Sequence, residues 1–402
     1  MMKKPLVNTL VQILGKAGSV AISLITTGIL TRKLGVEGYG SFILISSMFV
    51  FLDSLADFGT KTIGIREVAS AEEKNIWGKI FYLRLLMAVL AFLVGLGLVW
   101  GWKGFLSVRS EATVALIMIF LTSLGGFWEI LFQVRLKMGL KVMADMTFPL
   151  LFLGWLLTTR DSMTLMMVMV VYLVARAVSL LVGYWLAAGV EQVEIKKVDR
   201  EELKRLWQMS WPMGIFLVVF ATYDRAVDTM IIQNFRGAKE VAWYGLAYKI
   251  YGVLIQPAYF YVNSIFPILS GKNEHKRDLF WMSAGILLTV GVGTLLGGWW
   301  LAPWMVEVLG GAEYAPAVGI LRILGIAWVW SYLGHLFGFA LIANGGQKQM
   351  LYLGLMALVL NLGLNWWLIP HYGMTAAAWV TVLTEFFDMV MMGFFLRKQV
   401  RS

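Results

Sequence analysis

Long apolar runs separated by short polar breaks divide the chain into twelve segments. Each is close to the roughly 20 apolar residues that cross a bilayer as an α-helix. The predicted spans are 6–30, 38–58, 77–100, 112–134, 142–158, 162–188, 206–233, 241–266, 279–302, 317–343, 350–369 and 372–396. The pattern therefore predicts an all-α polytopic membrane protein with about 12 transmembrane helices.

The longest polar connection falls after the sixth span, at residues 191–205, and carries charges of both signs. This position predicts two six-helix lobes, residues 1–190 and 206–402, joined by a cytoplasmic linker and placed around a central cavity. A short internal similarity agrees, because an offset of 205 aligns Tyr39-Gly40 with Tyr244-Gly245, each pair lying between the first and second helix of its half. Transporters built from two related lobes bind substrate at the lobe interface.

Composition supports a membrane protein and removes other classes. Hydrophobic residues make up 59% of the 402 positions and charged residues 14%, which excludes ordinary soluble and disordered chains. The absence of cysteine excludes disulfides, thiolate metal sites and iron–sulfur clusters, and three scattered histidines do not form a metal site. We expect no catalytic residues, no metal and no cofactor other than a coupling ion.

The net charge of +10 follows membrane topology rather than a nucleic-acid surface. With the N-terminus inside, the inner connections hold roughly three times as many Lys and Arg residues as the outer ones, as short cytoplasmic loops do. Lys3 and Lys4 precede an apolar run that has no small-residue cleavage site, so we expect a retained first helix. The sequence predicts a cytoplasmic membrane location, with both termini in the cytoplasm, membrane lipids as neighbours and no nucleic-acid partner.

Ionisable residues inside predicted spans are candidates for function, because a charge in hydrocarbon costs about 2.5–3.5 kcal/mol on insertion scales. The cations in this position are Lys16, Arg84, Arg176, Arg225, Lys249 and Arg322. The acids are Asp53, Glu129, Asp145, Asp224, Asp228, Glu385 and Asp388.

Polar residues at steps of three and four place Gln12 and Lys16 on one face of the first helix, and Lys249, Gln256 and Tyr259 on one face of the eighth. Such faces predict a polar cavity for an anionic cargo such as a phosphate or diphosphate. The predicted cavity residues are Lys16, Arg84, Arg176, Lys249, Arg322, Gln12, Gln256 and Tyr259. Two alternatives remain: the stripes join helices by hydrogen bonds, or the cations form internal ion pairs, for example Arg84 with Asp53 or Asp57.

Asp224 and Asp228 lie one helical turn apart and, with Asp53, are candidates for binding Na⁺ or H⁺ as a coupling ion. The alternative is that Asp224 and Asp228 neutralise Arg225 and Lys249.

Several stretches resemble one known family in the right order along nearly the whole chain. They are Leu30 to Gly40, Asp53 to Gly59, Gly64 to Ala69, Phe132 to Ala144, Asp228 to Gly245, Asn361 to Asn365, and Leu368 to Ala377. They are similar to the oligosaccharide flippase (polysaccharide transporter) family of the multidrug/oligosaccharidyl-lipid/polysaccharide (MOP) exporter superfamily, although Thr375 stands where the family usually has glycine.

The resemblance implies a flippase for a polyprenyl-diphosphate-linked oligosaccharide in cell-envelope polysaccharide synthesis. It implies alternating access, a cationic cavity that holds the headgroup and glycan, and no enzymatic activity. We expect the chain to act as a monomer.

Two other functions stay open. A cation-coupled multidrug antiporter of the same superfamily predicts an acidic cavity, which Asp53, Asp224 and Asp228 would suit. A membrane glycan polymerase or ligase needs catalytic side chains in a large outer loop, and the longest predicted one, 303–316, has no Lys, Arg or His.

Overall fold

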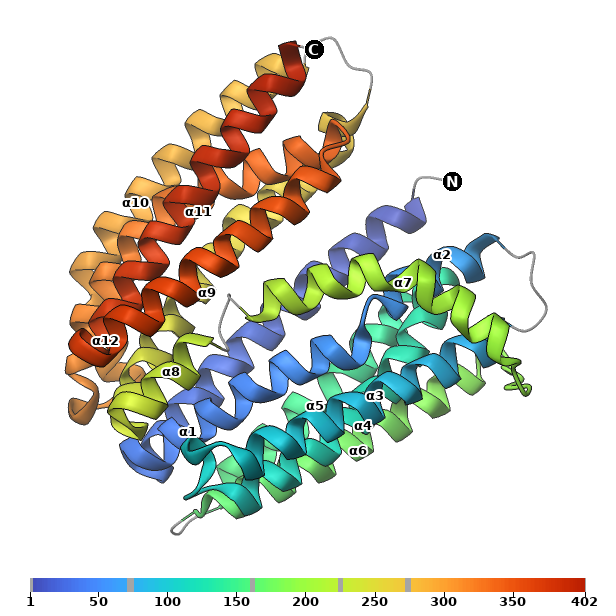
Figure 1. Ribbon diagram of the computed structural model, residues 1–402, viewed down its shortest axis with the longest axis horizontal. Helices are drawn as coiled ribbons and strands as arrows, with labels where there is room; N and C mark the ends of the chain where they lie inside the picture. The colour runs from blue at the N-terminus through green and yellow to red at the C-terminus, as the bar shows by residue number, and fades with distance from the viewer. Residues whose placement is uncertain (1–2, 71–75, 160–162, 223–226, 272–275, 402) are drawn as a thin grey trace. The chain divides into compact units, whose positions relative to one another are not determined.

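The computed structural model describes residues 3–70, 76–159, 163–222, 227–271 and 276–401, and all regular structure in these ranges is helical (Figure 1). The chain divides into two compact units, Met1–Ala221 and Thr222–Ser402. The first holds α1 (Lys3–Asp57), α2 (Thr60–Ser70), α3 (Ile76–Gly101), η1 (Lys103–Phe105), α4 (Arg109–Val134), α5 (Met138–Thr158), α6 (Leu165–Ala188) and α7 (Arg200–Ala221). The second holds α8 (Val227–Arg236), α9 (Ala238–Ser270), α10 (Lys276–Gly310), η3 (Ala312–Tyr314), α11 (Pro316–Ala343) and α12 (Gln347–Arg401).

Helices α1 and α12, of 55 residues each, are pairs of spans joined at a glycine. Gly35 has φ 67° and Gly373 has φ 60°, a left-handed conformation that residues with a Cβ rarely adopt. Nine helices in the described ranges are long and apolar enough to cross a membrane. Because two of them contain two spans, they account for eleven of the twelve predicted spans. The prediction of an all-α polytopic membrane protein is therefore confirmed.

The predicted span 206–233 is the exception, because the structure describes it as parts of two helices and residues 223–226 lie outside the described residues. In its place α7 ends at Ala221 and α8 begins at Val227. We also placed the start of the C-terminal lobe at residue 206, whereas the second compact unit begins at Thr222. The reason is that α7 packs against α1, α2 and α3. Gly214 of α7 approaches the ring of Phe58 so closely that a Cβ there would lie 2.5 Å from Cγ of that ring.

Each unit has its own buried centre. In the first, Ile80, Leu83, Phe127 and Ile130 of α3 and α4 form a core that Leu206 of α7 completes. In the second, α11 packs against α9, α10 and α12.

The centre of the second unit is aromatic. The indole of Trp328 on α11 fits beside Gly298, where a Cβ would lie 2.3 Å from Cζ3, and it donates a hydrogen bond to the carbonyl of Tyr251, 3.1 Å away. Close packing of this kind fixes the neighbouring polar side chains in position.

Candidate functional site

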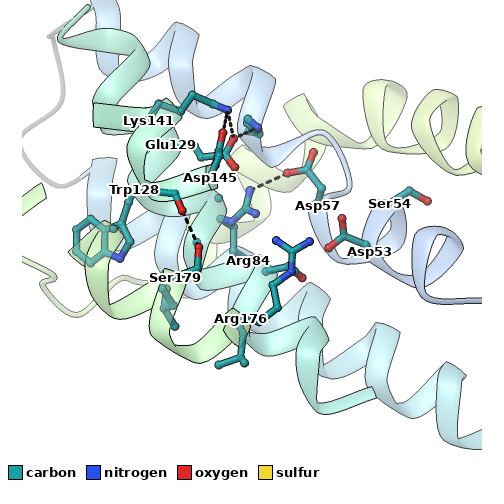
Figure 2. A pocket seen from close by; sticks show the side chains of 18 of the residues that line it. Asp53, Ser54, Asp57, Arg84, Trp128, Glu129, Lys141, Asp145, Arg176 and Ser179 are labelled. Carbon is teal, nitrogen blue, oxygen red and sulfur yellow. Dashed lines mark hydrogen bonds and ion pairs between the residues drawn. The ribbon is translucent and has the colours of Figure 1, made fainter. Parts of the chain in front are cut away.

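The first unit contains a polar cavity of about 470 Å³ (Figure 2), lined by side chains from all seven of its α-helices. Its charged lining residues are Asp53, Asp57, Lys61, Arg84, Glu129, Lys141, Asp145 and Arg176. Four cations thus face four carboxylates, so the described wall is formally neutral rather than cationic. The pairing of these groups decides which of them can take a ligand.

Arg84 of α3 is bound on several sides by the cavity wall. Its Nη1 donates to Asp57 Oδ1 at 2.7 Å and to Thr60 Oγ1 at 2.9 Å, and its Nε donates to the carbonyl of Ser123 at 2.8 Å. The side chain also fills the space beside Gly126, where a Cβ would overlap it. Arg84 is only 4% exposed and joins α1, α2, α3 and α4, so the ion-pair alternative describes it correctly.

A second group of ion pairs lines another part of the cavity (Figure 2). Glu129 of α4 pairs with Lys61 of α2 and lies 3.5 Å from Nζ of Lys141 on α5. Lys141 Nζ also lies 2.7 Å from Asp145 Oδ2, one turn further along α5. These three helices are therefore connected through alternating charges, and neither lysine is free of carboxylate contact.

Arg176 of α6 is held differently. Its guanidinium carbon lies 4.0 Å from the centre of the Phe148 ring and 6.0 Å from that of Tyr172, which are cation–π contacts. Among the described residues no carboxylate lies within ion-pair distance of Arg176, and its Nε has no hydrogen-bond partner. Figure 2 shows its guanidinium pointing toward Asp53. Arg176 is thus the cavity cation best placed to accept an added anion.

Of the eight predicted cavity residues, the structure brings only Arg84 and Arg176 into this cavity. Gln12 and Lys16 lie exposed on α1. In the second unit, Gln256 donates to the carbonyl of Gly252 at 3.4 Å, and the ring of Tyr259 contacts those of His335 and Phe339 on α11. Lys249 is half-buried on α9, and Arg322 lies on α11.

Arg322 contacts α10 at a proline. Pro303 lacks an N–H, so the carbonyl of Trp299, four residues earlier, loses its helical donor. Arg322 Nε donates to this oxygen at 3.2 Å, and its guanidinium carbon lies 5.5 Å from the centre of the Trp299 ring. This contact explains why a cation is present in a predicted span, and the explanation needs no bound ligand.

Replacing Arg322 with alanine should therefore lower stability by about 1 kcal/mol, the cost of one lost hydrogen bond, and leave cargo binding unchanged. Thermal unfolding of the purified protein in detergent measures the first effect and a lipid-linked cargo binding assay the second. Arg66→Ala, which removes an exposed cation of α2, is the control for loss of charge alone. Weaker cargo binding by Arg322→Ala than by Arg66→Ala would contradict this interpretation.

The second unit holds a buried cluster around Asp228 of α8, which is 1% exposed. Tyr244 Oη and Asn365 Nδ2 each donate to its carboxylate at 2.6 Å. Asn365 Nδ2 also lies 3.0 Å from Asn361 Oδ1, and Tyr244 Oη lies 3.3 Å from Thr381 Oγ1. The buried Asn365 Oδ1 has no partner among the described residues. Oxygen atoms from α8 and α12 therefore converge at one buried point.

The predicted coupling residues fall in different parts of the chain. Asp53 lines the cavity of the first unit, Asp228 lies in the second, and Asp224 falls outside the described residues. Sequence reasoning missed the Asn361, Asn365 and Thr381 oxygens. The four-residue spacing of the two asparagines in an apolar run was the available signal.

Sequence reasoning also missed Lys61 and Lys141 as cavity residues, because both lie outside the predicted spans. The structure places them on α2 and α5 beside Glu129.

Comparison with known proteins gives a family match and a shared fold. Residues 6–272 match the model of a family described as polysaccharide biosynthesis protein. No curated protein matches the chain by sequence.

Solved structures resemble the chain over nearly its whole length. The inward closed form of the lipid II flippase MurJ is 12% identical, with a TM-score of 0.79 over 98% of this chain and 87% of that one. An inward-facing multidrug resistance MATE family transporter of the MOP superfamily is 15% identical, with a TM-score of 0.75 over 95% of this chain and 94% of that one.

A third structure, a MOP superfamily transporter from Pyrococcus furiosus described as having a binding pocket of reverse polarity, is 15% identical. Its TM-score is 0.66 over 98% of this chain and 94% of that one. At such identities these likenesses establish the fold.

Proposed function

Since the chain belongs to the polysaccharide biosynthesis protein family and has the fold of MOP superfamily transporters, we propose that it is a flippase for a polyprenyl-diphosphate-linked oligosaccharide. In this function the polyprenyl tail stays in the bilayer while the headgroup and glycan cross through a polar cavity by alternating access. The protein moves its cargo without making or breaking covalent bonds. We place it in the cytoplasmic membrane as a monomer, with both termini in the cytoplasm.

The observation that carries the proposal is Arg176, a cation facing a polar cavity without a carboxylate partner among the described residues. Opposite unit charges about 4 Å apart attract by about 4 kcal/mol at an effective dielectric constant of 20. A guanidinium can also hold two phosphate oxygens at once through parallel N–H donors. Arg176 therefore suits the diphosphate of the cargo.

The cavity cations that are paired with carboxylates can also bind the diphosphate. A diphosphate that enters can replace Glu129 as the partner of Lys61 or Lys141, and Asp57 as the partner of Arg84. The displaced carboxylates are then free to accept hydrogen bonds from sugar hydroxyl groups. We retain Gln12, Lys16, Lys249, Gln256 and Tyr259 as proposed glycan contacts, because α1 and α9 present these polar side chains along otherwise apolar spans.

We further propose that the Asp228 cluster binds the coupling ion. A carboxylate, the amide oxygens of Asn361 and Asn365 and the hydroxyl of Thr381 are hard oxygen ligands that suit Na⁺, and the carboxylate alone suits H⁺. The unpartnered Asn365 Oδ1 supports this proposal, because a buried amide oxygen normally has a donor or a cation beside it.

Flipping by Arg176→Gln tests the proposed function. Loss of a charge-assisted contact worth about 1.5–3 kcal/mol should weaken transport of the diphosphate-linked cargo by on the order of tenfold or more. The assay follows a fluorescent polyprenyl-diphosphate oligosaccharide in reconstituted vesicles. Arg109→Gln is the matched control, since Arg109 donates to the carbonyls of Val99 and Trp100 at the end of α3 and does not line the cavity.

Absence of flipping by the wild-type protein with every diphosphate-linked glycan tried would reject the proposal. Equal activity of Arg176→Gln and wild type would remove Arg176 from the headgroup site.

A second candidate, a cation-coupled multidrug antiporter, is favoured by the carboxylates Asp53, Asp57, Glu129 and Asp145 in the same cavity. It predicts that cationic drugs bind and that Asp53→Asn weakens their binding. Binding of such drugs to the purified protein, measured by calorimetry, would favour this candidate over a flippase.

A further inference from the structure

Two carboxyl groups lie three residues apart in the second half of α12, away from the Asp228 cluster. Ser331 Oγ of α11 donates to Glu385 Oε2 at 2.7 Å. Tyr251 Oη of α9 lies 2.9 Å from the same Ser331 Oγ. Three helices of the second unit thus meet at Glu385, and Asp388 follows it by almost one turn.

Asp388 is buried and incompletely partnered. Asp388 is 8% exposed, and its Oδ1 makes no hydrogen bond to any described residue. No Lys or Arg in the described ranges lies within ion-pair distance of it. An ionised carboxylate is costly in such surroundings, and a second carboxylate on the same helix makes it more so, whereas a protonated carboxyl carries no charge.

The helices packed against α12 are α8, α9 and α11. The titratable and charged side chains that they carry through the middle of the second unit are Asp228, Tyr244, Tyr248, Lys249, Tyr251, Tyr332 and His335. His335 is engaged locally, because its Nδ1 lies 2.7 Å from the carbonyl of Ser331. The hydroxyl of Tyr244 is hydrogen-bonded to Asp228, and that of Tyr251 to Ser331. None of the hydrogen bonds and ion pairs described for these groups involves Asp388.

We propose that Asp388 holds a proton in this conformation and forms, with Glu385, a proton-binding site distinct from the Asp228 cluster. The two sites are connected along α12, because Thr381, which contacts Tyr244, precedes Glu385 by one turn. When water reaches Asp388, the proton passes from its carboxyl group to a water molecule and leaves a carboxylate. Use of this proton to drive transport rests on the proposed flippase function, whereas its presence on Asp388 does not.

Infrared spectroscopy of the full-length protein in lipid nanodiscs, titrated with pH, tests the site directly. Wild type should show the carbonyl stretch of a protonated carboxyl at neutral pH, and Asp388→Asn should lack that component. Glu194→Gln is the control, because Glu194 is an exposed carboxylate of the 191–205 connection and should contribute nothing to this band. Identical bands in wild type and Asp388→Asn would overturn the proposal.

Glu385→Gln provides a second test that does not depend on the folding of Asp388→Asn. Removing the neighbouring carboxyl group should change the pH midpoint at which the Asp388 band disappears, because interacting carboxyl groups lose their protons as a pair. An unchanged midpoint would overturn the pairing of Asp388 with Glu385. If the wild-type protein shows the Asp388 band but flips no lipid-linked glycan, only the flippase function is rejected. If it flips the glycan but lacks the band, only the proton-binding site is rejected.

Discussion

Replacing Arg84 with methionine should destabilise the protein by about 3–5 kcal/mol, the largest effect expected for any cavity residue. Methionine has about the length of the aliphatic part of arginine but no charge and no N–H donors. The change leaves Asp57 without its cation and removes the donors that bind Thr60 and the Ser123 carbonyl. Because Arg84 joins four helices, its loss should reduce the yield of folded protein as well as the unfolding temperature.

Thermal unfolding in detergent, followed by size-exclusion chromatography, measures this effect. The double variant Arg84→Met/Asp57→Asn should recover part of the loss, because the uncompensated carboxylate is then gone. Arg66→Met is the matched control: Arg66 pairs with its neighbour Glu67 at the surface, where an ion pair contributes at most about 1 kcal/mol. Similar unfolding temperatures for Arg84→Met and Arg66→Met would show that the buried pair does not stabilise the fold.

Asp228→Asn should abolish stabilisation by the coupling ion. A site at a hundred times its dissociation constant stabilises a protein by about 2.7 kcal/mol. Wild-type protein should therefore unfold at a higher temperature in sodium chloride than in choline chloride, and the variant should show no difference. Asparagine keeps the shape of the side chain and can accept the hydrogen bond of Tyr244, so the change removes the charge with little loss of packing.

The same unfolding measurements, repeated at several pH values, distinguish the two candidate ions. A wild-type response to sodium at constant pH identifies Na⁺, whereas a response to pH that is equal in both salts and absent from the variant identifies H⁺. Asp199→Asn in the exposed 191–205 connection is the control and should behave as wild type. A wild-type protein insensitive to both ions would remove the coupling proposal for Asp228.

The fold was largely predictable because the length of an apolar run is a local property. Gly35 lies between the first two predicted spans and Gly373 is the second residue of the last one, 372–396, and both residues interrupt a helix in the structure. The assignment of α7 to the first unit was not predictable in this way. Which unit α7 joins depends on contacts such as Phe58 with Gly214, which lie far apart in the sequence.

The site was predictable in kind but not in arrangement. Arg84, Arg176 and Asp53 are charged residues within apolar spans and line the cavity of the first unit, whereas their part in binding stays a prediction. The sequence could not show that Arg84 has a carboxylate partner while Arg176 has none among the described residues, since pairing depends on the positions of neighbouring helices. Arg322 has the same sequence signature, yet a proline on another helix determines its partner.

The balance of four cations and four carboxylates in the first unit bears on turnover. A strongly positive chamber would retain a diphosphate and slow its dissociation, whereas here each anion that arrives competes with resident carboxylates. On departure those carboxylates recombine with Lys61, Lys141 and Arg84, so the vacated chamber carries no excess charge. In the proposed cycle, the cavity of the first unit therefore needs no additional bound ion to balance its own charge once the cargo has left.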